Sequence, residues 1–130
     1  YYLDQSVEIN GSEFDGVIEA VREANAFTYV GVVERAASGG SIYCSLVAID
    51  PREGIVGVHR KLKPTYGERL VWADGDGAGL VAHEHKGVRL TGLNCWENWM
   101  VQITISTILQ FLGIGLTFEC WKLMQFLNLM

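Results

Sequence analysis

The sequence predicts one domain of the α+β class, in which a helix precedes a series of strands. Apolar residues before residue 22 repeat with a helical period, the next three runs are rich in β-branched and aromatic residues, and glycine, proline and aspartate separate those runs. A chain of 130 residues is long enough to bury one hydrophobic core. We therefore expect a single domain, which is incomplete for the reasons given below.

The predicted helix follows Ser12-Glu13-Phe14-Asp15, a pattern that resembles a capping box. In such a box a hydroxyl and an acidic side chain three residues later bind the free amides of the first turn. The apolar face of this helix consists of Phe14, Val17, Ile18 and Val21, spaced i, i+3, i+4 and i+7. We expect this face to pack against the sheet.

Three runs predict the strands of an antiparallel meander: residues 27–33, 41–49 and 55–62. Alternation along the third run places Lys61 on the same face as His59 and Gly57. A glycine-rich loop over residues 63–79 is long enough to be functional.

Two further strands are predicted at residues 80–83 and 88–94, joined by a turn at residues 84–87. The second would bring Cys95 to the turn between a strand and a helix. Backbone amides and the helix dipole favour a thiolate at such a turn.

Charge and cysteine content exclude several classes of protein. The net charge is −5 and no basic stripe is present, which argues against a nucleic-acid partner. The three cysteines, Cys44, Cys95 and Cys120, are odd in number and lack CxxC spacing, so neither a disulfide framework nor a zinc knuckle is indicated. No signal-peptide pattern opens the sequence, and we expect a cytoplasmic protein.

The apolar segment from residue 101 to 118 has no charged side chain and just reaches the minimum length of a membrane-spanning helix. It leaves an alternative function open, that of a non-catalytic remnant or interaction module which associates through an exposed sheet face or through this apolar tail. We expect that the protein has no membrane partner.

Cys95, Lys61 and Glu68 supply the three chemical types that a thiol nucleophile needs: the sulfur, a cation and a carboxylate. Each also has an ordinary structural explanation. A cysteine often fills a buried position inertly, a lysine at a strand end is usually solvated, and Glu68 could pair with Arg69 or Arg60. The three residues indicate a catalytic site only when they are taken together as parts of one mechanism.

No metal site is expected. The histidines and aspartates that could form one, His59, His83, His85, Asp74 and Asp76, match no common zinc signature and lack the remaining ligands of a calcium loop. The glycines at positions 75, 77 and 79 are predicted to be turn glycines, because no Lys-Ser/Thr pair follows them as in a phosphate-binding loop.

Four motifs carry a family resemblance: residues 59–65 (HRKLKPT), 68–72 (ERLVW), 74–77 (DGDG) and 92–98 (GLNCWEN). In type, order and spacing they resemble the nitrilase branch of the carbon-nitrogen hydrolase superfamily. The resemblance covers residues 1–100, which we interpret as a partial domain of that family. Residues 101–130 form an apolar tail that does not match it.

The resemblance implies that Cys95 is the nucleophile, Lys61 the catalytic lysine and Glu68 a second glutamate that helps to position the site. Trp96, through its backbone amide, and Glu97 are the implied substrate-binding residues. The implied reaction converts a small-molecule nitrile to a carboxylic acid and ammonia through a thioimidate and a thioester, without metal or organic cofactor. The implied fold is an incomplete α-β-β-α sandwich, and full-length relatives are expected to form homo-oligomers.

One departure from the family pattern bears on activity. The family's general-base glutamate lies upstream of the position that matches Tyr1, and Glu34 corresponds to a different family position. We therefore expect nitrile hydrolysis by this chain to be impaired.

Overall fold

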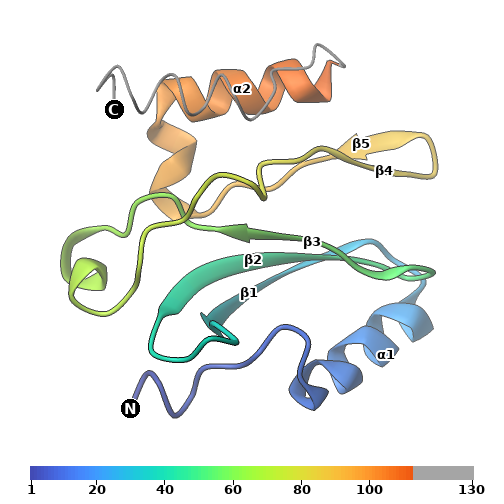
Figure 1. Ribbon diagram of the computed structural model, residues 1–130. Helices are drawn as coiled ribbons and strands as arrows, with labels where there is room; N and C mark the ends of the chain where they lie inside the picture. The colour runs from blue at the N-terminus through green and yellow to red at the C-terminus, as the bar shows by residue number, and fades with distance from the viewer. Residues whose placement is uncertain (113–130) are drawn as a thin grey trace.

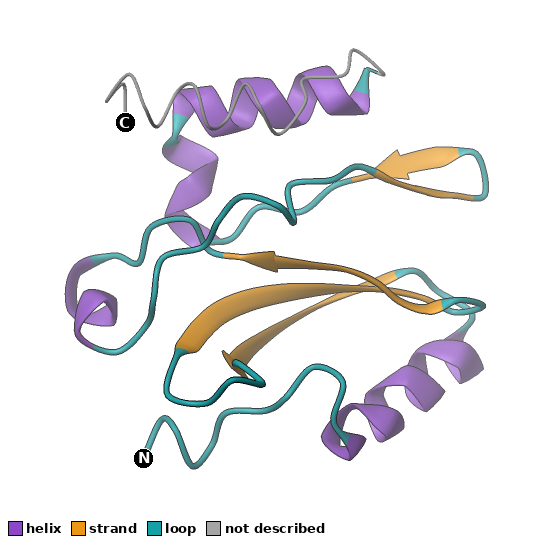
Figure 2. Cartoon of the chain, viewed as in Figure 1, coloured by secondary structure: helices purple, strands orange, loops and turns teal. Residues whose placement is uncertain are grey.

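The computed structural model describes residues 1–112 and contains both helices and strands, so the predicted α+β class is confirmed. Cys120 and the rest of the predicted tail beyond residue 112 lie outside the described residues. The elements, drawn in Figures 1 and 2, are η1 Ser12–Phe14, α1 Asp15–Ala24, β1 Thr28–Arg35, β2 Ile42–Asp50, β3 Gly54–Arg60, η2 Tyr66–Leu70, β4 His83–His85, β5 Val88–Leu90, η3 Cys95–Trp99 and α2 Val101–Phe111, where η denotes a 3-10 helix.

The first three strands form the predicted antiparallel meander, in the order β1-β2-β3. The turn between β2 and β3 is held by Asp50, whose Oδ1 accepts hydrogen bonds from the backbone amides of Arg52 and Glu53 at 2.7 and 3.3 Å. Gly54 closes this turn with φ +83°, a conformation that glycine adopts without strain. The meander is therefore specified by local turn chemistry as well as by strand propensity.

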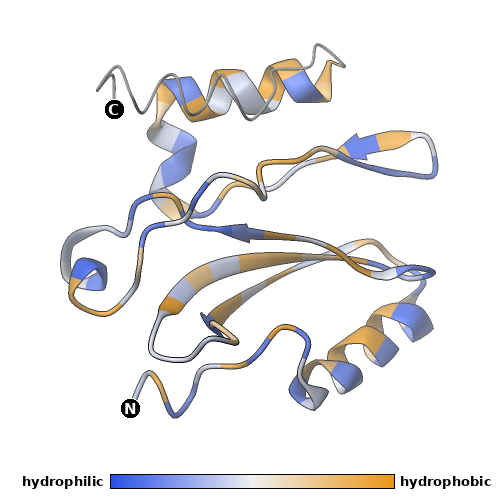
Figure 3. Ribbon diagram, viewed as in Figure 1, coloured by the Kyte–Doolittle hydropathy of each residue, from blue (hydrophilic) through white to orange (hydrophobic). Residues whose placement is uncertain are grey.

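Helix α1 covers one face of this sheet (Figure 1), and the predicted apolar face of the helix is confirmed. Phe14 and Val21 are buried against Val47 and Ile49 of β2, and Figure 3 shows the helix banded by hydrophobic and hydrophilic residues. The predicted capping box at Ser12 is wrong. The chain enters the helix through η1, and no side chain caps η1 or α1.

The β4–β5 hairpin and α2 lie on the opposite side of the sheet from α1 (Figure 1). The two strands of the hairpin have three residues each and are shorter than the predicted runs at residues 80–83 and 88–94. A second hydrophobic cluster joins Leu62 and Leu80 to Ile103 of α2, with Leu93 and Met100 packed against it. The first turns of the predicted tail are therefore packed against the domain. No helix within residues 1–112 has the length and apolarity needed to cross a bilayer.

The glycine-rich loop lies directly on β3. The amide of Gly75 donates a hydrogen bond of 2.9 Å to the carbonyl oxygen of Lys61. A Cβ atom at Gly75 would overlap the backbone of Arg60, and one at Gly79 would overlap the backbone of Val58. These two glycines permit close approach of two backbones, and of the three predicted turn glycines only Gly77 has a positive φ, of +80°.

Substitution of Gly75 by alanine is expected to destabilise the protein, because the added methyl group would force the loop away from β3. Overpacking of this kind costs about 1–3 kcal/mol. Gly67→Ala is the matched control, since open space surrounds Gly67 and its φ is not positive. Urea denaturation should show a lower midpoint for Gly75→Ala and an unchanged or slightly higher one for Gly67→Ala. Equal midpoints for both variants would contradict the close-approach explanation.

Candidate active site

Lys61 extends the sheet by one residue beyond β3. Its amide donates a hydrogen bond of 2.8 Å to the carbonyl oxygen of Cys44 in β2. Its side chain is only 1% exposed, so the ammonium group has lost most of its water. A buried ammonium needs an anionic partner to remain charged.

Glu68 is that partner. Lys61 Nζ lies 2.6 Å from Glu68 Oε2 and 3.3 Å from the hydroxyl oxygen of Thr65. The same carboxylate oxygen accepts hydrogen bonds from the amide and the hydroxyl of Thr65, at 2.6 and 2.8 Å. Thr65 and Glu68 thereby form a capping box at the start of η2. The box fixes the carboxylate in the position that the lysine requires.

The pKa values of this pair shift in opposite directions. Burial favours the neutral forms of both groups, but the hydrogen bond and charge of Glu68 raise the pKa of Lys61, with smaller contributions from the negative charges that Cys95 and Cys44 carry when ionised. The hydrogen bonds from Lys61 and Thr65 outweigh burial at Glu68 and lower its pKa. Both groups are therefore ionised at neutral pH.

Cys95 is exposed and is the first residue of η3. Its φ is +52°, in the left-handed region that non-glycine residues rarely adopt. The predicted turn from strand to helix is in fact a turn from a loop into a five-residue 3-10 helix, because β5 ends at Leu90. The negative charge of an ionised Cys95 makes a small contribution to the raised pKa of Lys61. That Cys95, Lys61 and Glu68 act together in one site stays a prediction.

Glu97 does not reach the surface where a substrate would contact it. Its side chain is 0% exposed, and both oxygens have partners. Oε1 accepts a hydrogen bond of 2.8 Å from the amide of Leu62, Oε2 accepts one of 2.7 Å from the amide of Asn94, and Nε2 of the buried His59 lies 3.0 and 2.9 Å from the two oxygens. This geometry gives no support to the substrate contact predicted for Glu97.

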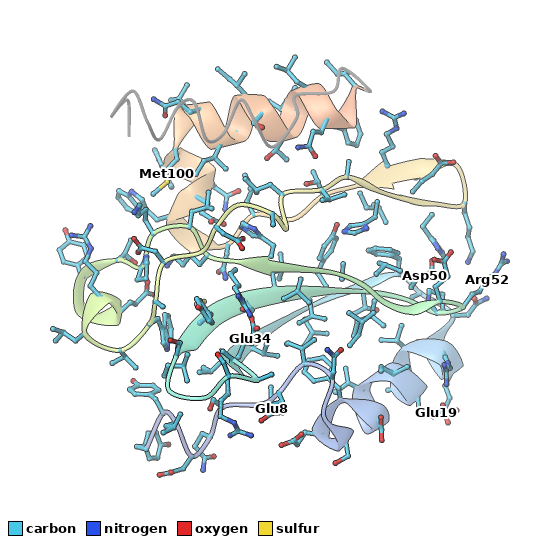
Figure 4. The ribbon with its side chains drawn as sticks, in the orientation of Figure 1. Glu8, Glu19, Glu34, Asp50, Arg52 and Met100 are labelled. Carbon is cyan, nitrogen blue, oxygen red and sulfur yellow. The ribbon has the colours of Figure 1, made fainter. Side chains whose placement is uncertain are left out.

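Trp96 is half-exposed, at 53%, and lines an open pocket of about 300 Å³. Pro64, Tyr66 and Met100 supply the other apolar surfaces, and Figure 4 labels Met100 at the junction of η3 and α2. Thr65, which contacts Lys61, also lines this pocket. The pocket therefore adjoins the Cys95 turn through Trp96 and the pair of Lys61 and Glu68 through Thr65.

A second thiol lies beside the site. Cys44 is half-buried in β2, and its sulfur accepts a hydrogen bond of 3.1 Å from the side-chain amide of Asn94, the residue before Cys95. Burial raises the pKa of Cys44, although the bond from Asn94 and the charge of Lys61 oppose the shift. Cys44 therefore stays a neutral thiol at neutral pH, which leaves Cys95 as the exposed thiol of the pair.

Glu34 belongs to the other face of the sheet, on the side of α1 (Figure 4). Its carboxylate is buried, accepts a hydrogen bond of 2.6 Å from Ser45 and is paired with Arg60. The guanidinium group of Arg60 in turn lies 4.1 Å from the ring centroid of Tyr43. The carboxylate is thus committed to a structural ion pair away from Cys95.

The histidines considered for a metal site are dispersed. His83 packs against Phe27 and Tyr29, and His85 Nδ1 lies 2.7 Å from Asp50 Oδ2. Within residues 1–112 no group of three potential metal ligands is found.

Sequence reasoning missed the roles of Thr65, Asn94 and His59. A signal was available for the first two, because Thr65-x-x-Glu68 and Asn94-x-x-Glu97 both have the spacing of a capping box, and the structure forms both boxes. Nothing in the sequence indicated His59, since its contact with Glu97 joins residues 38 positions apart.

An exposed thiol together with a buried lysine that is paired to a carboxylate is the type of site that cysteine hydrolases use. Comparison with known proteins specifies the family: residues 1–111 match the family model described as carbon-nitrogen hydrolase. The chain belongs to the carbon-nitrogen hydrolase family. The end of the family likeness, which we placed at residue 100, stays a prediction.

The relatives that this chain resembles are nitrilases. It is 45% identical over 101 residues to Nitrilase 2 of an unknown prokaryotic organism, covering 77% of this chain and 32% of the relative. It is 34% identical over 113 residues to a nitrilase of Bradyrhizobium diazoefficiens, covering 87% and 35%, and 36% identical over 110 residues to an arylacetonitrilase of Trametes versicolor, covering 76% and 34%. The chain thus spans about a third of the length of these relatives.

The ion pair between Lys61 and Glu68 predicts a definite pH dependence of stability. Glu68→Gln should lower the free energy of unfolding at pH 7 by about 2 kcal/mol, because it leaves a buried ammonium without an anion. The difference from the unsubstituted protein should shrink as the pH falls below 4.5, where the lowered pKa of Glu68 is crossed, and again as it rises above 10.5 through the raised pKa of Lys61.

Asp74→Asn is the matched control, since the pair of Asp74 with Lys63 is exposed at both ends and should contribute little. Urea denaturation of the three proteins between pH 3 and pH 11 measures these differences. A difference for Glu68→Gln that stays constant across this range would argue against the ion pair.

Proposed function

We propose that the protein is a nitrilase-type hydrolase that attacks a nitrile carbon with the thiolate of Cys95. The observation that carries this proposal is the carboxylate of Glu97, which binds the amide of Leu62, the residue after Lys61, and the amide of Asn94, the residue before the exposed Cys95. Glu68 holds the Lys61 ammonium in place. A thiol becomes a nucleophile when a neighbouring cation favours its ionised form. The family and the printed names of the relatives support a nitrile as the substrate.

The proposed reaction has three steps. The thiolate forms a bond with the nitrile carbon, and the nitrogen takes up the developing charge and then a proton, which gives a thioimidate. Water adds to this carbon and ammonia leaves, so that a thioester remains. A second water releases the carboxylic acid and regenerates the thiol. The Lys61 ammonium and the backbone amide of Trp96 would stabilise the charge on the nitrogen.

The pocket beside Trp96 is our candidate for the side group of the nitrile. Its apolar surfaces come from Pro64, Tyr66, Trp96 and Met100, and its volume of about 300 Å³ is within the range of small-ligand sites. An aliphatic or aromatic side group placed there would leave the nitrile carbon toward Cys95, the neighbour of Trp96. The second half of an α-β-β-α sandwich, as the family resemblance implies, would complete this site.

We also propose that the chain of 130 residues is impaired. The family resemblance assigns the general-base glutamate to no residue of this sequence, and the carboxylates of Glu68 and Glu97 already accept three hydrogen bonds or more. A thiol without a proton acceptor reacts slowly, and loss of a general base costs about 10²- to 10⁴-fold in rate.

Ammonia release from butyronitrile and phenylacetonitrile tests both parts of this proposal. The purified chain should release ammonia slowly, and added formate should accelerate the release by acting as an external proton acceptor. Cys95→Ala should abolish the reaction with and without formate, whereas Glu84→Gln, on the exposed surface of β4, should not change it. Release that persists in Cys95→Ala would refute the thiol mechanism, and a fast reaction that is independent of formate would refute the impairment.

A further inference from the structure

We infer that Glu97 and His59 are positioning residues, which together clamp the Cys95 turn to the end of β3 and so set the distance between Cys95 and Lys61. The inference rests on the proposed function for its catalytic meaning. The clamp itself rests on the contacts of one buried carboxylate. We define the clamp as Glu97 with its three partners, the imidazole of His59 and the amides of Leu62 and Asn94.

The partners of Glu97 lie next to the reacting residues. Asn94 precedes Cys95, and Leu62 follows Lys61. One carboxylate group therefore holds the backbone on the near side of the nucleophile and the backbone on the far side of the lysine, through bonds of 2.7 and 2.8 Å. A displacement of the Asn94 backbone from the Leu62 backbone must therefore stretch one of these two bonds. The packing of Leu93 and Met100 against Leu62 adds apolar contact between the same two segments.

His59 completes the clamp. His59 Nε2 lies 3.0 and 2.9 Å from the two carboxylate oxygens of Glu97. In the clamp Nε2 is the donor to an ionised carboxylate, which can only accept. The other ring nitrogen, Nδ1, is buried and has no hydrogen-bond partner among the described residues. Among the described residues the imidazole is therefore held by Glu97 rather than by a network of its own.

The 3-10 helix η3 depends on the clamp for its support. η3 has only five residues, and Asn94 provides its capping box with Glu97 at the third helical position. A turn of this length has little stability by itself. The positive φ of Cys95 adds strain at the first residue. The contacts of Glu97 with β3 supply the external support that such a strained turn needs.

The test uses the whole chain and two readouts. Amide hydrogen exchange of Leu62 and Asn94 reports on the clamp without reference to activity. The rate of alkylation of Cys95 by iodoacetamide, followed by peptide mass spectrometry, reports on the placement of the thiol next to Lys61. The half-buried Cys44 serves as an internal monitor of unfolding, because it reacts quickly only when the chain opens.

In Glu97→Gln the two amides should exchange about tenfold faster, because a neutral amide group cannot accept all three hydrogen bonds. Alkylation of Cys95 should slow by about tenfold, given that misplacement of reacting groups by about 1 Å can cost 10²-fold. Loss of a negative charge alone would speed the reaction of the thiol, so a slower reaction indicates misplacement. Glu84→Gln, which removes an exposed carboxylate from β4, should change neither readout.

Two variants of His59 test whether the hydrogen bond or only the packing of this side chain matters. His59→Gln places an amide donor where Nε2 lies and should retain most of the Cys95 rate, whereas His59→Phe fills the space without a donor and should lose it. A purely packing role would be served better by phenylalanine. If Glu97→Gln opens the chain, as judged by fast alkylation of Cys44, this pair of variants decides the question: equal behaviour of the two would overturn the clamp.

The clamp is also overturned if Glu97→Gln keeps Cys44 protected and Cys95 still reacts at the unsubstituted rate. A Cys95 that reacts no faster in the native chain than in urea would count against the proposed function alone. The exchange rates of the Leu62 and Asn94 amides would then decide the clamp by themselves, since they depend on no assumption about the thiol.

Discussion

The burial of the Lys61 ammonium is the constraint on which the rest of the site depends. A cation that is 1% exposed must have an anion in contact, and Glu68 lies 2.6 Å away. That requirement fixes the loop after β3, because Glu68 is also tied to the backbone of Thr65. The ion pair therefore determines the path of the chain as well as the charge of the lysine.

Two glutamates near the end of β3 combine a local capping box with a long-range contact. In each case a glutamate at the third position of a five-residue 3-10 helix closes a capping box and also binds β3 or the residues that follow it. Glu68 receives the side chain of Lys61, and Glu97 receives the amide of Leu62. Local capping alone would leave two short turns free to move. The long-range contact of each glutamate anchors its turn to the sheet.

The sheet keeps its two buried ion pairs apart. Successive residues of a strand point to opposite faces, so Arg60 meets Glu34 on the side of α1, while Lys61 meets Glu68 on the other side. This separation prevents Glu34 from competing for Lys61. It also explains how two adjacent basic residues, the buried Lys61 and the partly exposed Arg60, can each have a carboxylate of their own.

The sequence by itself determined the class of the fold, the meander and the inner face of α1, because turn residues and periodicity are local properties. The grouping of Cys95 with Lys61 and Glu68 stays a prediction from the motifs. The sequence did not determine the hairpin boundaries, the close-approach glycines or the role of Glu97. Strand length depends on pairing partners, and the need for glycine at position 75 arises only when the loop meets Arg60. The burial of Glu97 was decided by tertiary structure, since only folding brings His59 and Leu62 to its carboxylate.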